Sequence, residues 1–122
     1  MNCPNFVILV VDDEDLIREL VGEQLENRGY EVILASSADA AFEILHNTPR
    51  IDLIVTDVRM PGLMNGFDLV ERAVARRPNL RTIIMSGYTA GSGQLIARAD
   101  RFLTKPFTLA SLEKEVRSLL SV

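Results

Sequence analysis

Charged and polar side chains follow four apolar runs of the sequence, at the point where each run ends. These side chains are Asp12 and Asp13 after residues 6–11, Asp57 after residues 51–56, Ser86 after residues 82–85, and Lys105 after residues 102–104. If the runs are parallel strands, their carboxyl ends meet at one edge of a sheet, where α/β folds place their chemistry. The sequence therefore predicts one site with three carboxylates, a hydroxyl and an amine.

Three carboxylates in one place need a positive counter-charge. Two unit charges about 4 Å apart repel by about 4 kcal/mol at an effective dielectric constant near 20. Lys105 supplies one positive charge, and a bound cation or a proton on one acid would relieve the remaining repulsion. Since the candidate ligands are oxygen atoms, with no His or Cys at the strand ends, we expect a hard cation, Mg²⁺ or Mn²⁺.

Such a site suits phosphoryl transfer. A carboxylate beside Mg²⁺ can attack phosphorus as a nucleophile, while the metal and Lys105 neutralise the transferring oxygens. Ser86 can donate a hydrogen bond to one of those oxygens. The product would be an aspartyl phosphate on Asp57.

The apolar runs alternate with segments of helical periodicity along the whole chain, which predicts repeated βα units and a parallel sheet. We expect strands over residues 6–11, 32–35, 51–56, 81–85 and 101–104. We expect helices over residues 14–28 with Asp13 as the cap, from Ser36 or Ser37 to Thr48, over residues 67–76, and from Thr108 onward. The glycine-rich residues 87–100 predict a short or irregular fourth helix, because glycine costs a helix about 1 kcal/mol relative to alanine.

With right-handed crossovers, these elements predict a flavodoxin-like, doubly wound α/β fold. Its five parallel strands would run in the order 2-1-3-4-5 inside a three-layer α/β/α sandwich. In that order the first and third strands are neighbours, which brings Asp12 and Asp13 beside Asp57.

Length and composition fit a single domain over residues 1–122, with a core of about residues 5–121. The chain is 48% hydrophobic and 25% charged, and its net charge of -4 argues against direct binding to anionic nucleic acid. No apolar stretch approaches the length of a membrane span, and residues 6–11 are too few for a signal peptide, so we expect a cytoplasmic protein. The single cysteine, Cys3, excludes an internal disulfide.

Four motifs at the strand ends resemble those of response-regulator receiver domains, the chemotaxis-regulator-like modules of two-component and phosphorelay signalling. The motifs are Val10-Val11-Asp12-Asp13-Glu14, Thr56-Asp57-Val58-Arg59-Met60-Pro61-Gly62, Met85-Ser86-Gly87-Tyr88 and Thr104-Lys105-Pro106-Phe107. The resemblance spans about residues 5–121. It implies that Asp57 accepts a phosphoryl group from a histidine kinase or a histidine phosphotransfer protein.

The resemblance also implies a set of metal ligands. Asp13 and Asp57 would bind Mg²⁺ through their side chains and Arg59 through its backbone carbonyl, while Asp12 would act through a metal-bound water. The Lys105–Pro106 peptide bond is expected to be cis, as it is in the family.

Further residues are implied to respond to the phosphoryl group or to flank it. Ser86 would bond the group, Lys105 would form an ion pair with it, and Phe102 would turn inward as the switch. Arg59 and Tyr88 flank the site at positions that tune dephosphorylation in the family. The face built by the fourth helix, fifth strand and last helix would bind a downstream protein target, or a second copy of the chain in a homodimer.

Two stretches depart from the family pattern. The loop from Pro61 to Gly66 is about one residue longer than in the commonest receivers, and it forms a wall of the site, so access or phosphoryl lifetime is expected to differ. The stretch from Ser86 to Lys105 is about three residues shorter than in the family. This stretch contributes to the usual output face, so whether that face is built in the usual way is left as an open question.

Two other functions are compatible with parts of the pattern. One is a Mg²⁺-dependent phosphatase with Asp57 as nucleophile, but Arg59 stands where such enzymes carry a second acid. The other is a flavodoxin-like binding module that is never phosphorylated, against which the full set of acids, Ser86 and Lys105 argues. The initiating Met and the end of the last helix favour a stand-alone receiver over one cut from a hybrid kinase or a DNA-binding regulator.

Overall fold

The computed structural model describes residues 6–60, 62–86 and 99–120. Along these residues the strands and helices alternate: β1 (Val7–Val11), α1 (Asp15–Asn27), β2 (Glu31–Ala35), α2 (Ala38–Asn47), β3 (Leu53–Asp57), α3 (Gly66–Arg76), β4 (Arg81–Ser86), β5 (Arg101–Thr104) and α4 (Leu109–Leu120). The strands form one parallel sheet in the order β2-β1-β3-β4-β5, which confirms the predicted flavodoxin-like topology. The segment in which a short fourth helix was expected lies largely outside the described residues.

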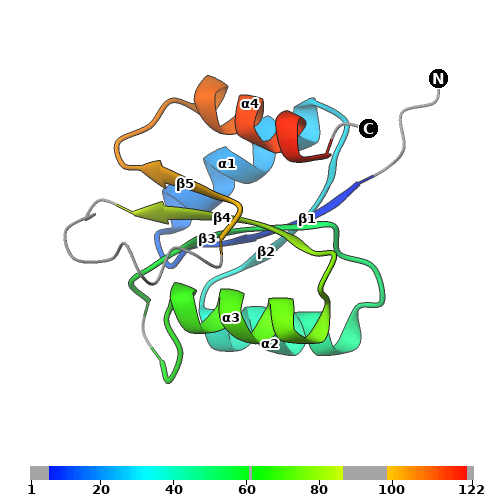
Figure 1. The fold of residues 1–122 in the computed structure, drawn as a ribbon. Coiled ribbons are helices and arrows are strands. Elements are labelled where there is room, and N and C mark those ends of the chain that lie inside the picture. Colours follow the sequence, from blue (N-terminus) through cyan, green and yellow to red (C-terminus); the bar gives the residue numbers. More distant parts are fainter. Residues whose placement is uncertain (1–5, 61, 87–98, 121–122) are drawn as a thin grey trace.

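The sheet is covered by helices on both faces. Helices α1 and α4 pack on one face and α2 and α3 on the other (Figure 1). Successive residues of a strand point to opposite faces, so β1 divides its side chains between two cores. Val7, Leu9 and Val11 join the core under α2 and α3, while Ile8 and Val10 join the core under α1 and α4. A strand buried on both faces reads as a continuous apolar run, as β1 does.

The predicted boundaries of the strands and helices are close to the observed ones, and two predictions need correction. Asp13 is not the cap of the first helix, because the N-cap is Glu14 and its side chain makes no capping hydrogen bond. The third strand begins at Leu53 rather than residue 51. Ile51 is buried but precedes the ladder, and the Asp52 carboxylate accepts a hydrogen bond from the backbone N–H of Val7.

Other predicted caps are confirmed. The Ser37 hydroxyl accepts a hydrogen bond from the N–H of Ala40 at the start of α2. The Thr108 hydroxyl does the same for the N–H of Ser111 at the start of α4. Gly29, at a φ of 96°, ends α1 in the left-handed conformation that favours glycine.

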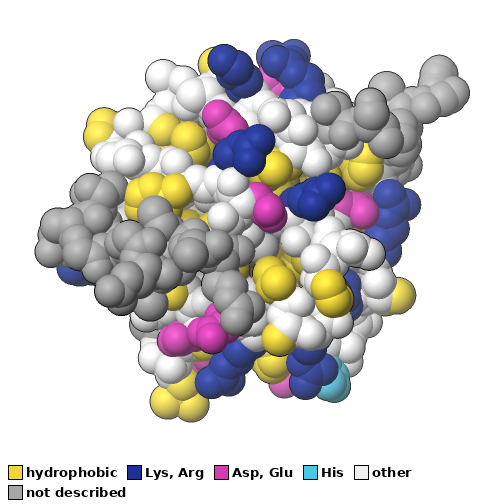
Figure 2. Space-filling model, in the orientation of Figure 1, with side chains coloured by type: hydrophobic (Ala, Val, Ile, Leu, Met, Phe, Trp, Pro, Cys, Tyr) yellow, Lys and Arg dark blue, Asp and Glu magenta, His cyan; other side chains and the backbone are white. Residues whose placement is uncertain are grey.

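Charged side chains of both signs are interspersed on the face seen in Figure 2, with apolar side chains between them. A surface of this kind differs from the continuous basic stripe that nucleic-acid-binding domains present. Among the helices of residues 6–60, 62–86 and 99–120, none combines the length and apolar character that crossing a membrane requires.

Candidate phosphorylation and metal site

The predicted residues come together at the carboxyl ends of the strands. Strand pairing places Val11 opposite Thr56, Asp57 opposite Met85, and Ser86 opposite Thr104. Asp12 and Lys105 each follow their strand directly, so all the strand ends meet along one edge. A hollow of about 460 Å³ opens there, and it is lined by Asp13, Glu14, Asp57, Val58, Arg59, Ser86 and Lys105.

Three carboxylates converge in this hollow. Asp12, Asp13 and Asp57 can each offer an oxygen such that all three oxygens lie within 4.8 Å of one another. Asp12 is fully buried, Asp57 is partly buried and Asp13 is exposed to solvent. A hard cation with oxygen ligands fits this donor set, and the exposed side leaves room for the waters that Mg²⁺ usually keeps.

Lys105 provides the positive charge that the acids need. Its Nζ lies 3.4 Å from Oδ2 of Asp12 and 3.4 Å from Oδ2 of Asp57. The Lys105 side chain is 20% exposed, so one ammonium group bridges two carboxylates in a partly desolvated place. The Lys105–Pro106 peptide bond is cis, as expected.

Backbone groups hold the other carboxylate oxygens. Oδ1 of Asp57 accepts a hydrogen bond from the N–H of Val58 at 2.8 Å, and Oδ1 of Asp12 accepts one from the N–H of Glu14 at 2.9 Å. Each of these two acids therefore has one oxygen on the backbone and one facing Lys105. These contacts hold the plane of each carboxylate, which is the preorganisation a reacting site needs.

Burial raises the pKa of Asp57 above its ordinary value, although the N–H of Val58 and the charge of Lys105 act in the opposite direction. The charge of Asp12 adds to the increase. For Lys105, burial lowers the pKa, but the charges of Asp57 and Asp12 outweigh that effect and the pKa is raised overall. Lys105 is thus held in its charged form, while charge on Asp57 comes at a cost in free energy.

The loop between β3 and α3 begins at the site and is tied back to it. The N–H of Gly66 donates to the carbonyl oxygen of Val58 at 2.8 Å, which closes the loop over residues 58–66. A Cβ atom on Gly66 would lie 2.0 Å from the carbonyl oxygen of Asp57, so only glycine fits there. The side chain of Met64 is buried and that of Met60 packs against the same core, so both methionines anchor the loop.

The remaining predicted residues also have defined positions. Ser86 is buried at the end of β4, and its carbonyl oxygen accepts the N–H of Lys105 at 2.7 Å. Phe102 lies half-buried on β5, opposite Ile84 of β4. Arg59 lies at the exposed rim of the hollow, two residues after Asp57. Tyr88 falls outside the described residues.

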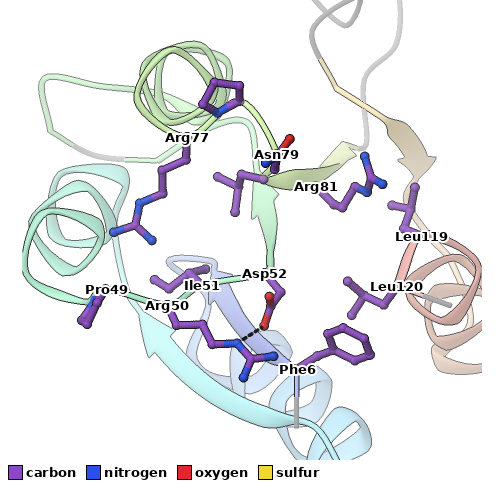
Figure 3. A pocket seen from close by; sticks show the side chains of 12 residues that line it. Phe6, Pro49, Arg50, Ile51, Asp52, Arg77, Asn79, Arg81, Leu119 and Leu120 are labelled. Atoms are coloured by element: carbon purple, nitrogen blue, oxygen red, sulfur yellow. Dashed lines mark hydrogen bonds and ion pairs between the residues drawn. The ribbon is translucent and has the colours of Figure 1, made fainter. Parts of the chain in front are cut away.

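A second hollow lies at the opposite, amino end of the strands (Figure 3). It holds about 430 Å³ and contains one acid, Asp52, which pairs with Arg50 at 3.1 Å. Arg77 donates to the carbonyl oxygens of Leu45 and Thr48. Asp52 and Arg77 thus hold chain segments together here. Among the described residues, the one group of three acids that could hold a metal ion is at the carboxyl edge.

Two residues near the site were not identified from the sequence. Asp39, in the first turn of α2, accepts a hydrogen bond from the N–H of Leu63 in the β3–α3 loop. Its sequence position indicates only an acid near a helix start. Gly66 was expected to precede α3, whereas it is the first helical residue and touches the Asp57 backbone. Neither contact leaves a local sequence signal, because both join segments that are brought together by the fold.

Comparison with known proteins settles the family. Residues 8–117 match the model of the response regulator receiver domain. The chain belongs to this family. The response regulator receiver protein CpdR of Brucella abortus is 34% identical over 117 residues, which cover 93% of this chain and 95% of that protein.

Solved structures show the same receiver fold. The CheY-like receiver domain protein of Methanospirillum hungatei superposes with a TM-score of 0.87 at 30% identity, over 94% of this chain and 93% of that chain. The response regulator TrrA of Thermotoga maritima, solved in complex with Mg²⁺ and BeF, has a TM-score of 0.86 at 31% identity, over 94% of this chain and 99% of that chain.

Receiver domains are the phosphoacceptors of two-component signalling, and this chain carries that function as a member of the family. The chain spans 48%, 30% and 12% of the length of three other curated relatives, which include further regions. The activities of those longer proteins therefore do not carry over to this chain.

Proposed function

We propose that Asp57 is the phosphoacceptor of this receiver domain and that it reacts with the help of Mg²⁺. The observation that carries the proposal is the convergence of three carboxylate oxygens within 4.8 Å beside the ammonium group of Lys105. One oxygen of Asp57 attacks the phosphorus of a phosphohistidine, the P–N bond breaks, and the imidazole leaves and takes up a proton. The donor is a histidine kinase or a histidine phosphotransfer protein.

Each neighbour of Asp57 has a role in this step. Asp13, Asp57 and the backbone carbonyl of Arg59 would hold Mg²⁺, and Asp12 would bind through a water molecule. The metal would neutralise negative charge on the transferring phosphoryl group. Lys105 would leave its place between Asp12 and Asp57 to pair with the new phosphoryl oxygens.

The same residues would switch the domain. Phosphorylation adds almost two negative charges and three acceptor oxygens at Asp57. Ser86 and Lys105 would move toward them, and the space behind Ser86 would admit Phe102. A population change from 1:99 to 99:1 needs about 5.5 kcal/mol. Two charge-assisted hydrogen bonds, at about 1.5–3 kcal/mol each, supply most of it.

The output of the switch would be read by another protein. The face of β5 and α4, next to Phe102, would bind a downstream target or a second copy of the chain. In this proposal the domain is a signalling phosphoacceptor and not a phosphatase, so a small phosphoester would not be turned over by it. Arg59 and Tyr88 would set how long the phosphoryl group survives.

The test is the intact mass of the protein after incubation with acetyl phosphate. We expect the wild type to gain one phosphoryl group with Mg²⁺ and none with a chelator, and Asp57→Asn to gain none. Asp52→Asn is the matched control, because Asp52 precedes the same strand at its opposite end, in the hollow of Figure 3. It should be modified like the wild type.

A negative result for the wild type has two causes that can be separated. Beryllium fluoride forms a stable mimic of the aspartyl phosphate, so its binding would show a competent site with a short-lived phosphoryl group. If the folded protein neither gains a phosphoryl group from acetyl phosphate nor binds beryllium fluoride, the phosphoacceptor role of Asp57 is wrong.

A further inference from the structure

The loop between β3 and α3 is held from outside by one residue of α2. Oδ2 of Asp39 accepts a hydrogen bond from the backbone N–H of Leu63 at 3.0 Å. Asp39 belongs to the first turn of α2, 24 positions before Leu63 in the chain. The bond therefore joins a helix that carries none of the proposed site residues to the loop that forms a wall of the site.

The loop fits closely around this carboxylate. Gly62 has a φ of 111°, and a Cβ atom on it would lie 2.3 Å from Oδ2 of Asp39. The side chain of Leu63 is 98% exposed, so apolar packing does not hold the chain at this point. The Asp39 carboxylate is thus a tertiary contact of residues 62–63, and the loop passes it at a glycine.

The position of this contact matters for the metal. The anchored side chains of Met60 and Met64 lie on either side of residues 62–63 in the sequence, and Arg59 comes three residues before Gly62. Arg59 and Gly62 therefore belong to the same short loop that Asp39 holds at the N–H of Leu63. A backbone carbonyl binds a metal well only if it is held within about 0.5 Å of its place.

We propose that Asp39 is a positioning residue for phosphoryl chemistry at Asp57. By holding the N–H of Leu63, it keeps the β3–α3 loop where the carbonyl of Arg59 can bind Mg²⁺. Asp39 touches neither the metal nor the phosphoryl group. The inference rests on the proposed function and adds to it the device that holds this longer loop in place.

The experiment is a calorimetric titration of Mg²⁺ into the metal-free protein. Asp39→Ala should weaken Mg²⁺ binding by about tenfold, the lower end of the range for partners of metal ligands. Asp39→Asn keeps an acceptor oxygen and loses the charge, so it should bind Mg²⁺ within about twofold of the wild type. Glu43→Ala removes an exposed acid one turn later on α2 and should change nothing.

A second variant reaches the same bond from the loop side. The Cβ atom in Gly62→Ala would push the Asp39 carboxylate away, so this variant should weaken Mg²⁺ binding to a similar degree. Because both substitutions break one interaction, the double variant should bind Mg²⁺ no more weakly than about the worse single variant. Thermal unfolding without Mg²⁺ shows whether each variant is folded.

The outcomes separate this inference from the proposed function. If the wild type is phosphorylated and Asp39→Ala binds Mg²⁺ as tightly as the wild type does, the positioning role of Asp39 is wrong and the proposed function stands. If Asp39→Asn is as weak as Asp39→Ala, the charge matters rather than the hydrogen bond, and the inference is again wrong. If the wild type binds no Mg²⁺, both fail. If Asp39→Ala does not fold, the Mg²⁺ affinities of Asp39→Asn and Gly62→Ala still test the positioning role of Asp39.

Discussion

Asp57 is surrounded by groups with opposite effects on its charge. Burial and the neighbouring Asp12 disfavour the carboxylate, whereas the N–H of Val58 and Lys105 favour it, and the net result is a raised pKa. The folded protein therefore binds a proton at Asp57 more tightly than the unfolded chain does. It follows that ionised Asp57 costs stability at neutral pH, and that this cost disappears as the pH falls through the pKa values of the folded and then the unfolded state.

We predict that Asp57→Asn stabilises the metal-free protein at pH 7. Asparagine is neutral at every pH and has a similar shape, so it removes the cost of the buried charge. The gain should be on the order of 1 kcal/mol, the usual size of a single-residue effect. Below the pKa of Asp57, where the wild type is also neutral, the difference should shrink. Urea unfolding in a chelator at pH 7 and at a series of lower pH values measures both quantities.

The opposite result has a clear meaning. If Asp57→Asn is less stable than the wild type at pH 7, the ion pair with Lys105 at 3.4 Å outweighs the desolvation of Asp57.

At the scale of elements, α3 begins against the backbone of β3. Asn65 caps this helix in a capping box with Asp68, and Gly66 follows as the first helical residue. The Cβ clash at Gly66 is with backbone atoms, the carbonyl oxygen of Asp57 at 2.0 Å and Cα of Val58 at 3.0 Å. Backbone atoms cannot rotate away as a side chain can, so the start of α3 and the end of β3 must move together.

We predict that Gly66→Ala destabilises the protein by about 2 kcal/mol or more, as overpacking in a well-packed interior typically does. It should also weaken Mg²⁺ binding, because Asp57 and Val58 shift. Gly22→Ala in α1 is the matched control: its Cβ would lie 3.0 Å from Cδ2 of Leu34, the end of a partly exposed side chain. There the better helix propensity of alanine, up to about 1 kcal/mol, should offset the contact. Urea unfolding of both variants tests this prediction. Equal losses of unfolding free energy in Gly66→Ala and Gly22→Ala would contradict it.

The sequence predicted which strands and helices form better than it predicted where each one begins and ends. Apolar runs at β1 and β3 identify strands buried on both faces, but burial and strand pairing are different properties. Ile51 is buried without belonging to the β3 ladder, so its apolar character extended the predicted strand too far. Asp13 looked like a helix cap because it precedes an amphipathic segment, whereas its carboxylate faces Asp12 and Asp57 across the site.

At the scale of the whole molecule, strand order brings the site together. Asp12 and Asp57 are 45 residues apart in the sequence, and they meet because β1 and β3 are neighbours in the sheet. That juxtaposition was predictable from the alternation of strands and helices with the rules of parallel sheets. The hydrogen bond of Asp39 to the β3–α3 loop was not, because it depends on the path of one loop across the surface.

Three carboxylates and one ammonium group meet at one edge of the fold. Lys105 pairs with Asp12 and Asp57, and Mg²⁺ would neutralise the remaining negative charge. A ligand that binds only the folded state stabilises it by about 2.7 kcal/mol at a concentration of 100 times its Kd. Since each kcal/mol shifts the Tm of a domain of this size by about 3–5 °C, we predict that saturating Mg²⁺ raises the Tm by roughly 10 °C.

Asp13→Asn distinguishes a specific site from general screening of the acidic protein. Asp13 is exposed, and its oxygen lies with those of Asp12 and Asp57, so the variant loses a proposed ligand with little loss of packing. Its Mg²⁺-dependent rise in Tm should be mostly lost, while that of Asp52→Asn should match the wild type. Thermal unfolding at constant ionic strength, with Mg²⁺ replaced by Na⁺ in the reference, makes the comparison. An equal rise in Asp13→Asn would show that Mg²⁺ acts on the net charge of -4 and not through these three carboxylates.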